Sequence, residues 1–158
     1  MPLSKPEWFK IRLPDSKQYS QVASWLRRHQ LHTICFEARC PNRSACWSEG
    51  TATFLILGSR CTRSCAFCAV TKGRPLPPDP DEPRRIAEVI YCLGIRYAVI
   101  TSVTRDDLED GGASTFAATV EAIRQLCPST LIELLIPDFQ GSEEALRIVL
   151  ASKPDVIG

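Results

Sequence analysis

Six cysteines fall into two spaced triplets within one short stretch of the chain. The first triplet has the spacing C-x4-C-x5-C, and the second has the spacing C-x3-C-x2-C (Cys35, Cys40 and Cys46; Cys61, Cys65 and Cys68). Three thiolates are one ligand short of a tetrahedral metal site or of a four-iron, four-sulfur (4Fe–4S) cube. Each triplet therefore leaves one coordination position open, and an open position on a metal is where chemistry takes place. Two such triplets predict an enzyme with two metal centres.

The composition is ordinary for a globular domain, with 158 residues, 44% of them hydrophobic and 23% charged, which is enough for a real core. The net charge of +1 gives no electrostatic basis for binding nucleic acid or an anionic membrane, so we expect neither as a partner. The first residues contain no apolar signal region, and no apolar run approaches the roughly 20 residues of a membrane span. We therefore expect a cytoplasmic protein, in which cysteines serve metal binding or catalysis rather than disulfides.

The sequence predicts two parts, an N-terminal extension at residues 1–51 and a repeating α/β region at residues 52–158. In the extension, apolar residues recur at helical spacing after Asp15, a residue type that favours helix starts, and predict one helix ending near His29. Residues 33–50 carry the first triplet and show no clear period. We expect a loop there.

Strands and helices alternate from residue 53 onward. Short apolar runs predict strands at 53–57, 97–101, 131–136 and 155–158. Helices are predicted between Asp81 and Gly94, at 114–126, and after the cap Ser142. This order is typical of a parallel sheet and predicts the N-terminal portion of a (β/α) partial TIM barrel. A complete barrel needs about 250 residues, so we expect the chain to be the front part of a longer architecture.

The second triplet follows the first predicted barrel strand, at the end where barrel enzymes place their active sites. Its three cysteines suit three irons of a 4Fe–4S cube, which leaves the fourth iron free to chelate an amino and a carboxylate group. With the aromatic Phe67 before Cys68, the motif resembles that of the radical S-adenosylmethionine (SAM) enzymes. In that superfamily the free iron binds the methionine part of SAM, and one electron breaks a C–S bond to give a 5′-deoxyadenosyl radical. The alternative is a zinc site, for which the sequence offers neither a second C-x2-C pair nor an H-x3–5-H pair.

The residues around the first triplet indicate one family among the radical SAM enzymes. Residues 32–68, HTICFEARCPNRSACWSEGTATFLILGSRCTRSCAFC, closely resemble lipoyl synthases, in which an E-A-R-C-P-N-like segment carries auxiliary-cluster cysteines. Residues 5–14 (KPEWFKIRLP), 101–112 (TSVTRDDLEDGG) and 132–141 (IELLIPDFQG) also resemble family segments. The resemblance covers nearly the whole chain, and the combination of both triplets makes it specific. Phe36 departs from the family pattern, which has an acidic residue at that position.

The resemblance implies an enzyme that inserts two sulfur atoms, at C6 and C8 of an octanoyl group on a lysine of a lipoyl-carrier protein domain. The second triplet would hold the cluster that cleaves SAM, and the first would hold an auxiliary cluster consumed as the sulfur donor. It therefore implies two adjacent 4Fe–4S clusters, SAM and a low-potential electron donor. In the family a serine of an R-S-S-Y motif is the fourth auxiliary ligand, and this sequence has no such motif. We expect this polypeptide to be a fragment of the full enzyme.

Four other residues are candidates for cofactor binding, and three of them have a second interpretation. Phe67 lies inside the second triplet. Gly111 and Gly112 either let the backbone approach the methionyl carboxylate or form a turn. Glu133, a charge within an apolar strand, either projects toward the SAM ribose or has a structural partner. Three charged residues after the second barrel strand either hold SAM or the substrate amide, or are solvated charges that cap the next helix (Arg105, Asp106 and Asp107).

Three alternatives to a lipoyl synthase remain open. The first is another radical SAM enzyme with an auxiliary cluster. The second is an iron–sulfur-binding fragment without turnover. The third is a zinc-stabilised binding module.

Overall fold

The computed structural model describes residues 16–158, with side chains from Tyr19 onward. Its main feature is a five-stranded sheet in the order β1-β2-β5-β6-β7. The first strand is antiparallel to its neighbour and the other four are parallel (β1 His32–Thr33, β2 Thr51–Ile56, β5 Tyr97–Ser102, β6 Leu131–Leu135 and β7 Val156–Ile157). The predicted parallel α/β sheet is confirmed, and it is consistent with part of a radical-SAM-type (β/α) barrel.

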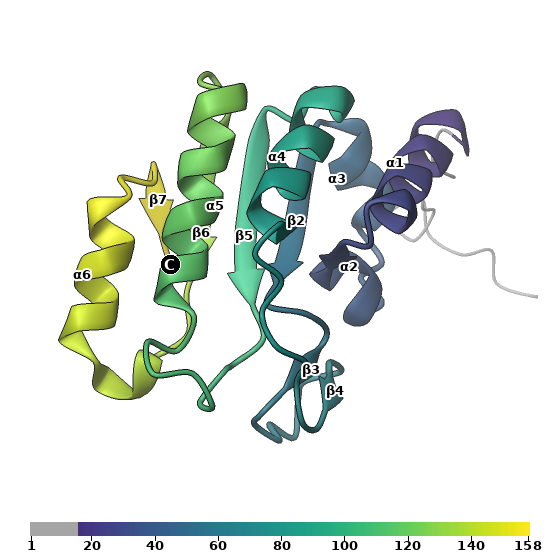
Figure 1. Ribbon diagram of the computed structural model, residues 1–158. Helices are drawn as coiled ribbons and strands as arrows, with labels where there is room; N and C mark the ends of the chain where they lie inside the picture. The colour runs from purple at the N-terminus through teal and green to yellow at the C-terminus, as the bar shows by residue number, and fades with distance from the viewer. Residues whose placement is uncertain (1–15) are drawn as a thin grey trace, which may run out of the picture.

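Three helices connect the parallel strands and pack on one face of the sheet (Figure 1). They are α4 (Glu82–Leu93), α5 (Ala113–Leu126) and α6 (Glu143–Ala151). Because side chains alternate along a strand, Ile132 and Leu134 of β6 lie under these helices and are fully buried. Leu131 and Leu135 on the other face are 50% and 48% exposed. One face is therefore covered by helices and the other is open, as in the wall of a partial barrel.

The helix ends follow the capping residues that the sequence predicts. Ser142 Oγ accepts a hydrogen bond from the Ala145 N–H at 3.2 Å and caps α6. Gly94 ends α4 in the left-handed conformation, with φ 62°. Asp81 occupies the N-cap position of α4, but its side chain makes no cap bond. The predicted helix start at Asp15 lies outside the described residues, which begin within α1 (Ser16–Arg28).

The prediction of a loop at residues 33–50 is wrong. This segment forms part of β1 and two short helices, α2 (Ile34–Glu37) and α3 (Arg43–Ser48). The Thr33 hydroxyl accepts a hydrogen bond from the Phe36 N–H at 3.3 Å and caps α2. Helices this short show no hydrophobic period, because a period needs several turns to be visible.

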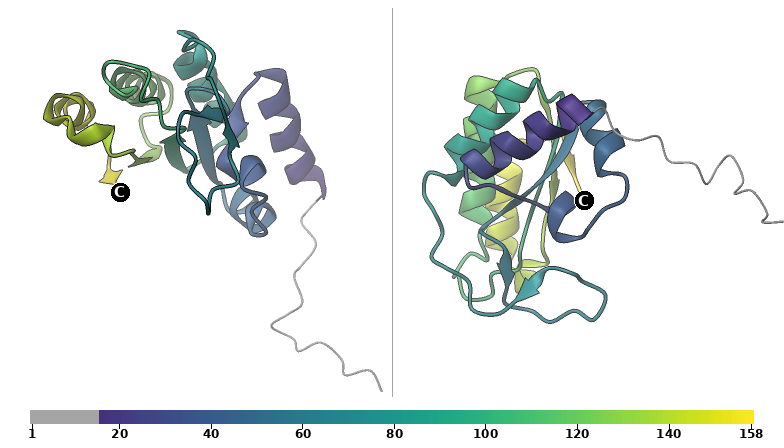
Figure 2. Two further views of the ribbon diagram at one scale, coloured as in Figure 1. Left: turned by 90° about the horizontal axis from the view of Figure 1, so that it is seen from below. Right: turned by 90° about the vertical axis from the view of Figure 1, so that its right-hand side faces the viewer.

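Helices α1, α2 and α3 gather at the edge of the sheet formed by β1 and β2 (Figures 1 and 2). Buried side chains of α1 and α3, among them Leu26 and Trp47, belong to the same hydrophobic core as the sheet. The first 51 residues thus share a core with the sheet where they are described, and a domain boundary between residues 51 and 52 stays a prediction. Among the described helices, none combines the length and apolar character of a membrane span.

Candidate metal centres

The second triplet lies on a loop that leaves the carboxyl end of β2 and closes on itself; residues 58–73 are called the cluster loop below. Two short parallel strands pair at its base, β3 (Arg60–Cys61) and β4 (Thr71–Lys72), and the Gly73 N–H donates to the Cys61 carbonyl at 3.0 Å. The Cys68 N–H donates to the Cys65 carbonyl at 3.2 Å. Cys65 is exposed and the other two cysteines are half-buried. The structure thus presents all three thiols on one closed loop at the predicted end of the sheet.

The chain enters the cluster loop through a strained turn at Leu57. This leucine has φ 66°, a left-handed conformation that costs about 1–2 kcal/mol for a residue with a Cβ. The Glu82 carboxylate accepts the Leu57 N–H at 2.8 Å, and the Arg105 guanidinium donates to the Leu57 carbonyl at 3.3 Å. Glu82 is 5% exposed and Arg105 is 2% exposed. Two buried charged side chains therefore hold the turn that directs β2 into the cluster loop.

Gly112 packs closely against this turn, and its neighbour Gly111 packs against Phe139. A Cβ atom on Gly112 would lie 2.2 Å from Leu57 Cδ1, and one on Gly111 would lie 2.9 Å from Phe139 Cδ1. Both glycines also have positive φ, 59° at Gly111 and 93° at Gly112. The structure therefore gives both positions a packing reason for glycine, and their contact with SAM stays a prediction.

Arg63, between Cys61 and Cys65, fixes the far part of the cluster loop. Its guanidinium donates two hydrogen bonds to Asp106 after β5, each 2.7 Å, and two to Asp138 after β6, at 2.7 and 2.8 Å. These bonds hold the pKa of Asp138 down at about 2 and the pKa of Asp106 below its usual value. Sequence reasoning missed this contact because the partners lie 43 and 75 residues away.

The charged residues 105–107 have structural partners. Arg105 is buried and donates to the Asp107 carboxylate at 2.8 and 2.9 Å, which does not fit the interpretation as a solvated charge. Helix α5 is capped instead by Asp110, which accepts the Gly112 and Ser114 N–H groups at 2.8 and 2.7 Å. The three residues therefore organise the loop after β5.

The first triplet is distributed over α2, α3 and the turn between them. Cys35 is buried in α2, whereas Cys40 and Cys46 are half-buried. The Cys40 N–H donates to the Cys35 carbonyl at 3.2 Å. The pKa of the Cys46 thiol is raised by burial first, and then by negative charge on Cys35 and Cys40. The three thiols therefore lie on one short segment, and their role as ligands of one cluster stays a prediction.

An arginine also lies inside the first triplet, but aromatic rings surround it. The Arg43 guanidinium carbon lies 4.2 Å from the Phe36 ring centroid, 5.2 Å from that of Tyr19 and 5.7 Å from that of Trp47. The Tyr19 and Trp47 rings stack at 5.4 Å. We call these four residues the aromatic cage. Phe36, the departure from the family pattern, is one of its walls.

A 4Fe–4S cube and a single metal ion require different arrangements of side chains. Within residues 16–158, no group of three His, Cys, Asp or Glu side chains is placed to hold one metal ion. In a cube each cysteine ligates a different iron, so convergence of three sulfurs on one point is not what the cluster requires. The donors of both triplets, three thiols on one short segment each, fit a cube with one iron left open.

Glu133 lies on the open face of the sheet. Its carboxylate accepts a hydrogen bond from the Tyr97 hydroxyl at 2.6 Å, which raises the pKa of Tyr97. The structural partner expected for this charge is therefore present. A contact between Glu133 and the SAM ribose stays a prediction.

Two cavities lie at the carboxyl end of the sheet. One cavity of about 260 Å³ lies between the loops after β5 and β6, with Gly111 and Phe139 in its wall. A wider one of about 940 Å³ lies between the cluster loop, Arg105 and the proline-rich segment 73–78. Both adjoin the loops where a barrel enzyme binds its ligands.

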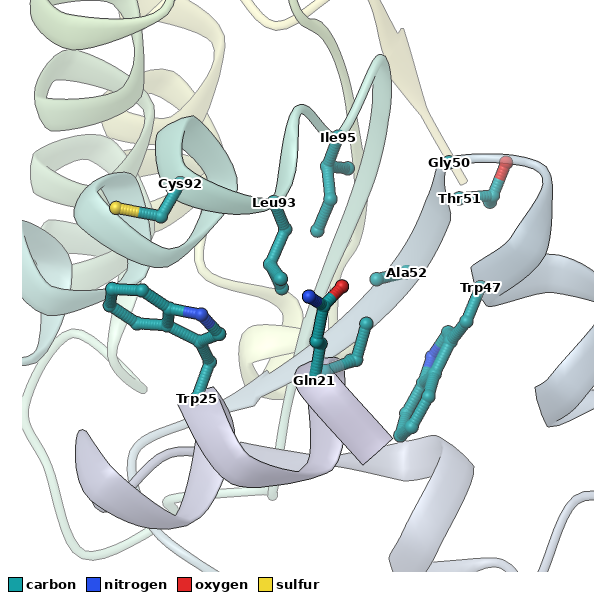
Figure 3. A pocket seen from close by; sticks show the side chains of 10 residues that line it. Gln21, Trp25, Trp47, Gly50, Thr51, Ala52, Cys92, Leu93 and Ile95 are labelled. Atoms are coloured by element: carbon teal, nitrogen blue, oxygen red, sulfur yellow. The ribbon is translucent and has the colours of Figure 1, made fainter. Parts of the chain in front are cut away.

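A further cavity of about 350 Å³ lies at the opposite end of β2. Figure 3 shows Gln21 between the indole rings of Trp25 and Trp47, with Leu93 and Ile95 behind them. It is remote from the carboxyl ends of the strands, where barrel enzymes carry out chemistry. We therefore do not assign the reaction to it.

Two models of known protein families match this chain. The model of the radical SAM superfamily matches residues 55–158, and the chain belongs to that superfamily. The model of the N-terminal domain of lipoyl synthase of the radical SAM family matches residues 2–40.

The most similar curated proteins include three lipoyl synthases. The one from Koribacter versatilis is 51% identical over 99% of this chain, and the one from a Roseiflexus species is 52% identical over 97%. The one from Chlorobaculum tepidum is 51% identical over 99% of the chain. These alignments cover 51%, 51% and 54% of the relatives. The chain thus spans about half the length of the curated relatives it matches.

Proposed function

We propose that the chain carries the two cluster-binding segments of a lipoyl synthase. Its reaction would be the radical-mediated insertion of two sulfur atoms, at C6 and C8 of an octanoyl group on a lysine of a lipoyl-carrier domain. The observation that carries the proposal is the presence of both triplets, each on one short segment, in a chain about half identical to lipoyl synthases along nearly its whole length.

The two triplets would hold two different 4Fe–4S clusters. Cys61, Cys65 and Cys68 would hold the cluster that binds SAM, and the first triplet would supply three ligands of the auxiliary cluster. When bound, the clusters and SAM supply one-electron cleavage of a C–S bond and the sulfur that enters the product. The open position on the second cluster would take the amino and carboxylate groups of SAM.

The chain's own side chains would position this chemistry. The turn at Leu57 directs the cluster loop, and Glu82 and Arg105 hold that turn. Phe67 is 93% exposed on the cluster loop, which suits an aromatic contact with SAM. Gly111 and Gly112 on the rim and Glu133 on the open face are the remaining candidates for contacts with SAM.

The reaction implies two partners. One is an octanoylated lipoyl-carrier domain and the other is a low-potential electron donor. We also propose a cytoplasmic location, because the predicted clusters require reduced thiols.

The proposal is tested by anaerobic reconstitution of the chain with iron and sulfide, followed by incubation with SAM, dithionite and an octanoyl-lysine peptide. In a polypeptide that also carries the R-S-S-Y serine, we expect 5′-deoxyadenosine and a peptide heavier by two sulfur atoms, both detected by mass spectrometry. Cleavage of SAM without sulfur insertion would indicate a different radical SAM enzyme. Loaded clusters without 5′-deoxyadenosine would indicate an iron–sulfur-binding polypeptide without turnover, and bound zinc without sulfide would rule out both enzymes.

A further inference from the structure

Arg63 joins three loops that follow three different strands. It belongs to the cluster loop after β2, Asp106 to the loop after β5, and Asp138 to the loop after β6. Four of its N–H groups donate to the two carboxylates at 2.7–2.8 Å. Two parallel hydrogen bonds to one carboxylate fix the angle between the guanidinium and the carboxylate as well as their distance.

The two carboxylates need this arginine between them. Asp106 and Asp138 repel each other, and the charge of Asp138 raises the pKa of Asp106 against the larger lowering by Arg63. Without the guanidinium, like charges would push the loops after β5 and β6 apart. The contact therefore holds the rim of the sheet together as well as the cluster loop.

The neighbouring Thr62 joins the cluster loop to the loop after β5 by hydrogen bonds. The Thr62 N–H and hydroxyl both donate to the Thr104 carbonyl, at 3.1 and 3.0 Å. The Thr62 hydroxyl accepts the Asp106 N–H at 3.2 Å. The stretch between Cys61 and Cys65 is thus fixed by backbone and side-chain bonds at consecutive residues.

We propose that Arg63 is a positioning residue that orders the cluster loop, through Asp106 and Asp138, before any iron binds. The loop's three thiols are then held in place relative to the ends of β5 and β6, where SAM would lie. This inference rests on the proposed function only in identifying residues 58–73 as a cluster-binding loop. The ordering itself is a property of the metal-free chain.

Hydrogen exchange of the metal-free, reduced chain tests the ordering directly. We compare wild type with Arg63→Ala and with the control Arg27→Ala, which changes an exposed arginine of α1, away from the cluster loop and without an ion pair among the described residues. We expect Arg63→Ala to speed exchange at Thr62, Cys68 and Gly73 about tenfold, since local opening becomes easier. The midpoint of thermal unfolding should stay close to that of the control. Equal exchange at these amides in the two variants would overturn the proposal.

Milder variants keep the test informative if Arg63→Ala disturbs folding. Arg63→Lys retains the positive charge but cannot form paired hydrogen bonds to both carboxylates. We therefore expect it to keep less than half of the protection from exchange that Arg63→Ala loses. Asp138→Asn removes one of the two carboxylates that Arg63 binds and should give an exchange rate between those of wild type and Arg63→Ala. Full protection in Arg63→Lys would show that charge alone suffices and would overturn the positioning role.

A second readout uses the reconstituted chain. After reduction, we expect addition of SAM to change the electron paramagnetic resonance spectrum of wild type and Arg27→Ala, and to change that of Arg63→Ala less. If wild type takes up no cluster, the proposed function fails while the exchange result still decides the role of Arg63. If exchange is unaffected, the role of Arg63 fails while the proposed function stands.

Discussion

The two cysteine triplets are held by different kinds of force. The cluster loop is fixed by charged side chains, with Glu82 and Arg105 at its start and Arg63 between its first two cysteines. The first triplet lies in short helices that pack through the aromatic cage around Arg43. Arg63 in the second triplet faces carboxylates, whereas Arg43, one of two arginines in the first triplet, faces aromatic rings.

This difference suits the two proposed roles. Directional hydrogen bonds fix a loop at one geometry, which a cluster that must bind SAM repeatedly requires. Ring contacts and burial are less directional and tolerate some rearrangement. A cluster that gives up its sulfur changes its composition, and a site held by packing accommodates such a change more readily.

The largest expected effect comes from removing one triplet at a time. Replacing all three cysteines of the second triplet by alanine should abolish SAM cleavage, since no iron would remain to bind SAM. Replacing the first triplet should leave SAM cleavage intact and abolish sulfur insertion. The measurement is 5′-deoxyadenosine and peptide product from the same reaction. Loss of SAM cleavage in both variants would show that the triplets do not have separate roles.

Removing the buried carboxylate at the start of the cluster loop should have the next largest effect. Glu82→Ala leaves the Leu57 N–H without its partner, and we expect a loss of about 1–3 kcal/mol in the free energy of unfolding. Glu82→Gln keeps an acceptor oxygen and should lose less. Chemical denaturation measures both, and equal losses would show that the hydrogen bond is unimportant.

The same residue predicts a pH dependence. Burial raises the pKa of Glu82, so the folded chain binds this proton more tightly than the unfolded chain. Its contribution to stability should therefore decrease as the pH rises from the ordinary glutamate pKa through the raised value. Glu82→Gln should lack this decrease, which denaturation at a series of pH values can show.

The aromatic cage provides the matching test on the first triplet. Arg43→Ala should lower the free energy of unfolding by about 1 kcal/mol, because a cation over aromatic rings contributes roughly this much. Arg43→Lys keeps a cation and should lose less, and Arg39→Ala, at an exposed arginine nearby, serves as the control. An effect of Arg43→Ala on exchange in the cluster loop as large as that at α2 would show that the two regions are not independent.

The smallest expected effect is the response of the Arg63 contacts to acid. The pKa of Asp138 is lowered to about 2, so its stabilising charge is fully present above the ordinary aspartate pKa and is lost as the pH falls through the lowered value. Exchange in the cluster loop, corrected for the intrinsic rate at each pH, should thus rise between about pH 4 and pH 2. Asp138→Asn should show a smaller rise, because Asp106 still pairs with Arg63 and also has a lowered pKa, and α2 should show none.

The parallel sheet was predictable because its signals are local. Apolar runs in β2, β5 and β6, the stop at Gly94 and the cap at Ser142 each depend on a few adjacent residues. The cysteine spacings are local in the same sense. The two short helices around the first triplet were missed because one or two turns leave no period to detect.

The contacts that hold the site were not predictable in this way. The Leu57 N–H finds its acceptor 25 residues later at Glu82, and Arg63 finds Asp138 75 residues later. Such pairs follow from the order of the strands in the sheet, which brings the loops after β2, β5 and β6 to one rim. An arginine inside each triplet was the available signal, and only the fold shows which groups surround it.

The most direct test is electron paramagnetic resonance of the reconstituted, reduced chain with and without SAM, together with iron and sulfide analysis. We predict iron and sulfide in equal amounts and a cluster spectrum that changes when SAM is added. The change should persist after the first triplet is replaced by alanine and disappear after the second is replaced. Bound zinc without sulfide, or a cluster spectrum that SAM leaves unaltered, would contradict the assignment of the second triplet as a SAM-binding cluster site.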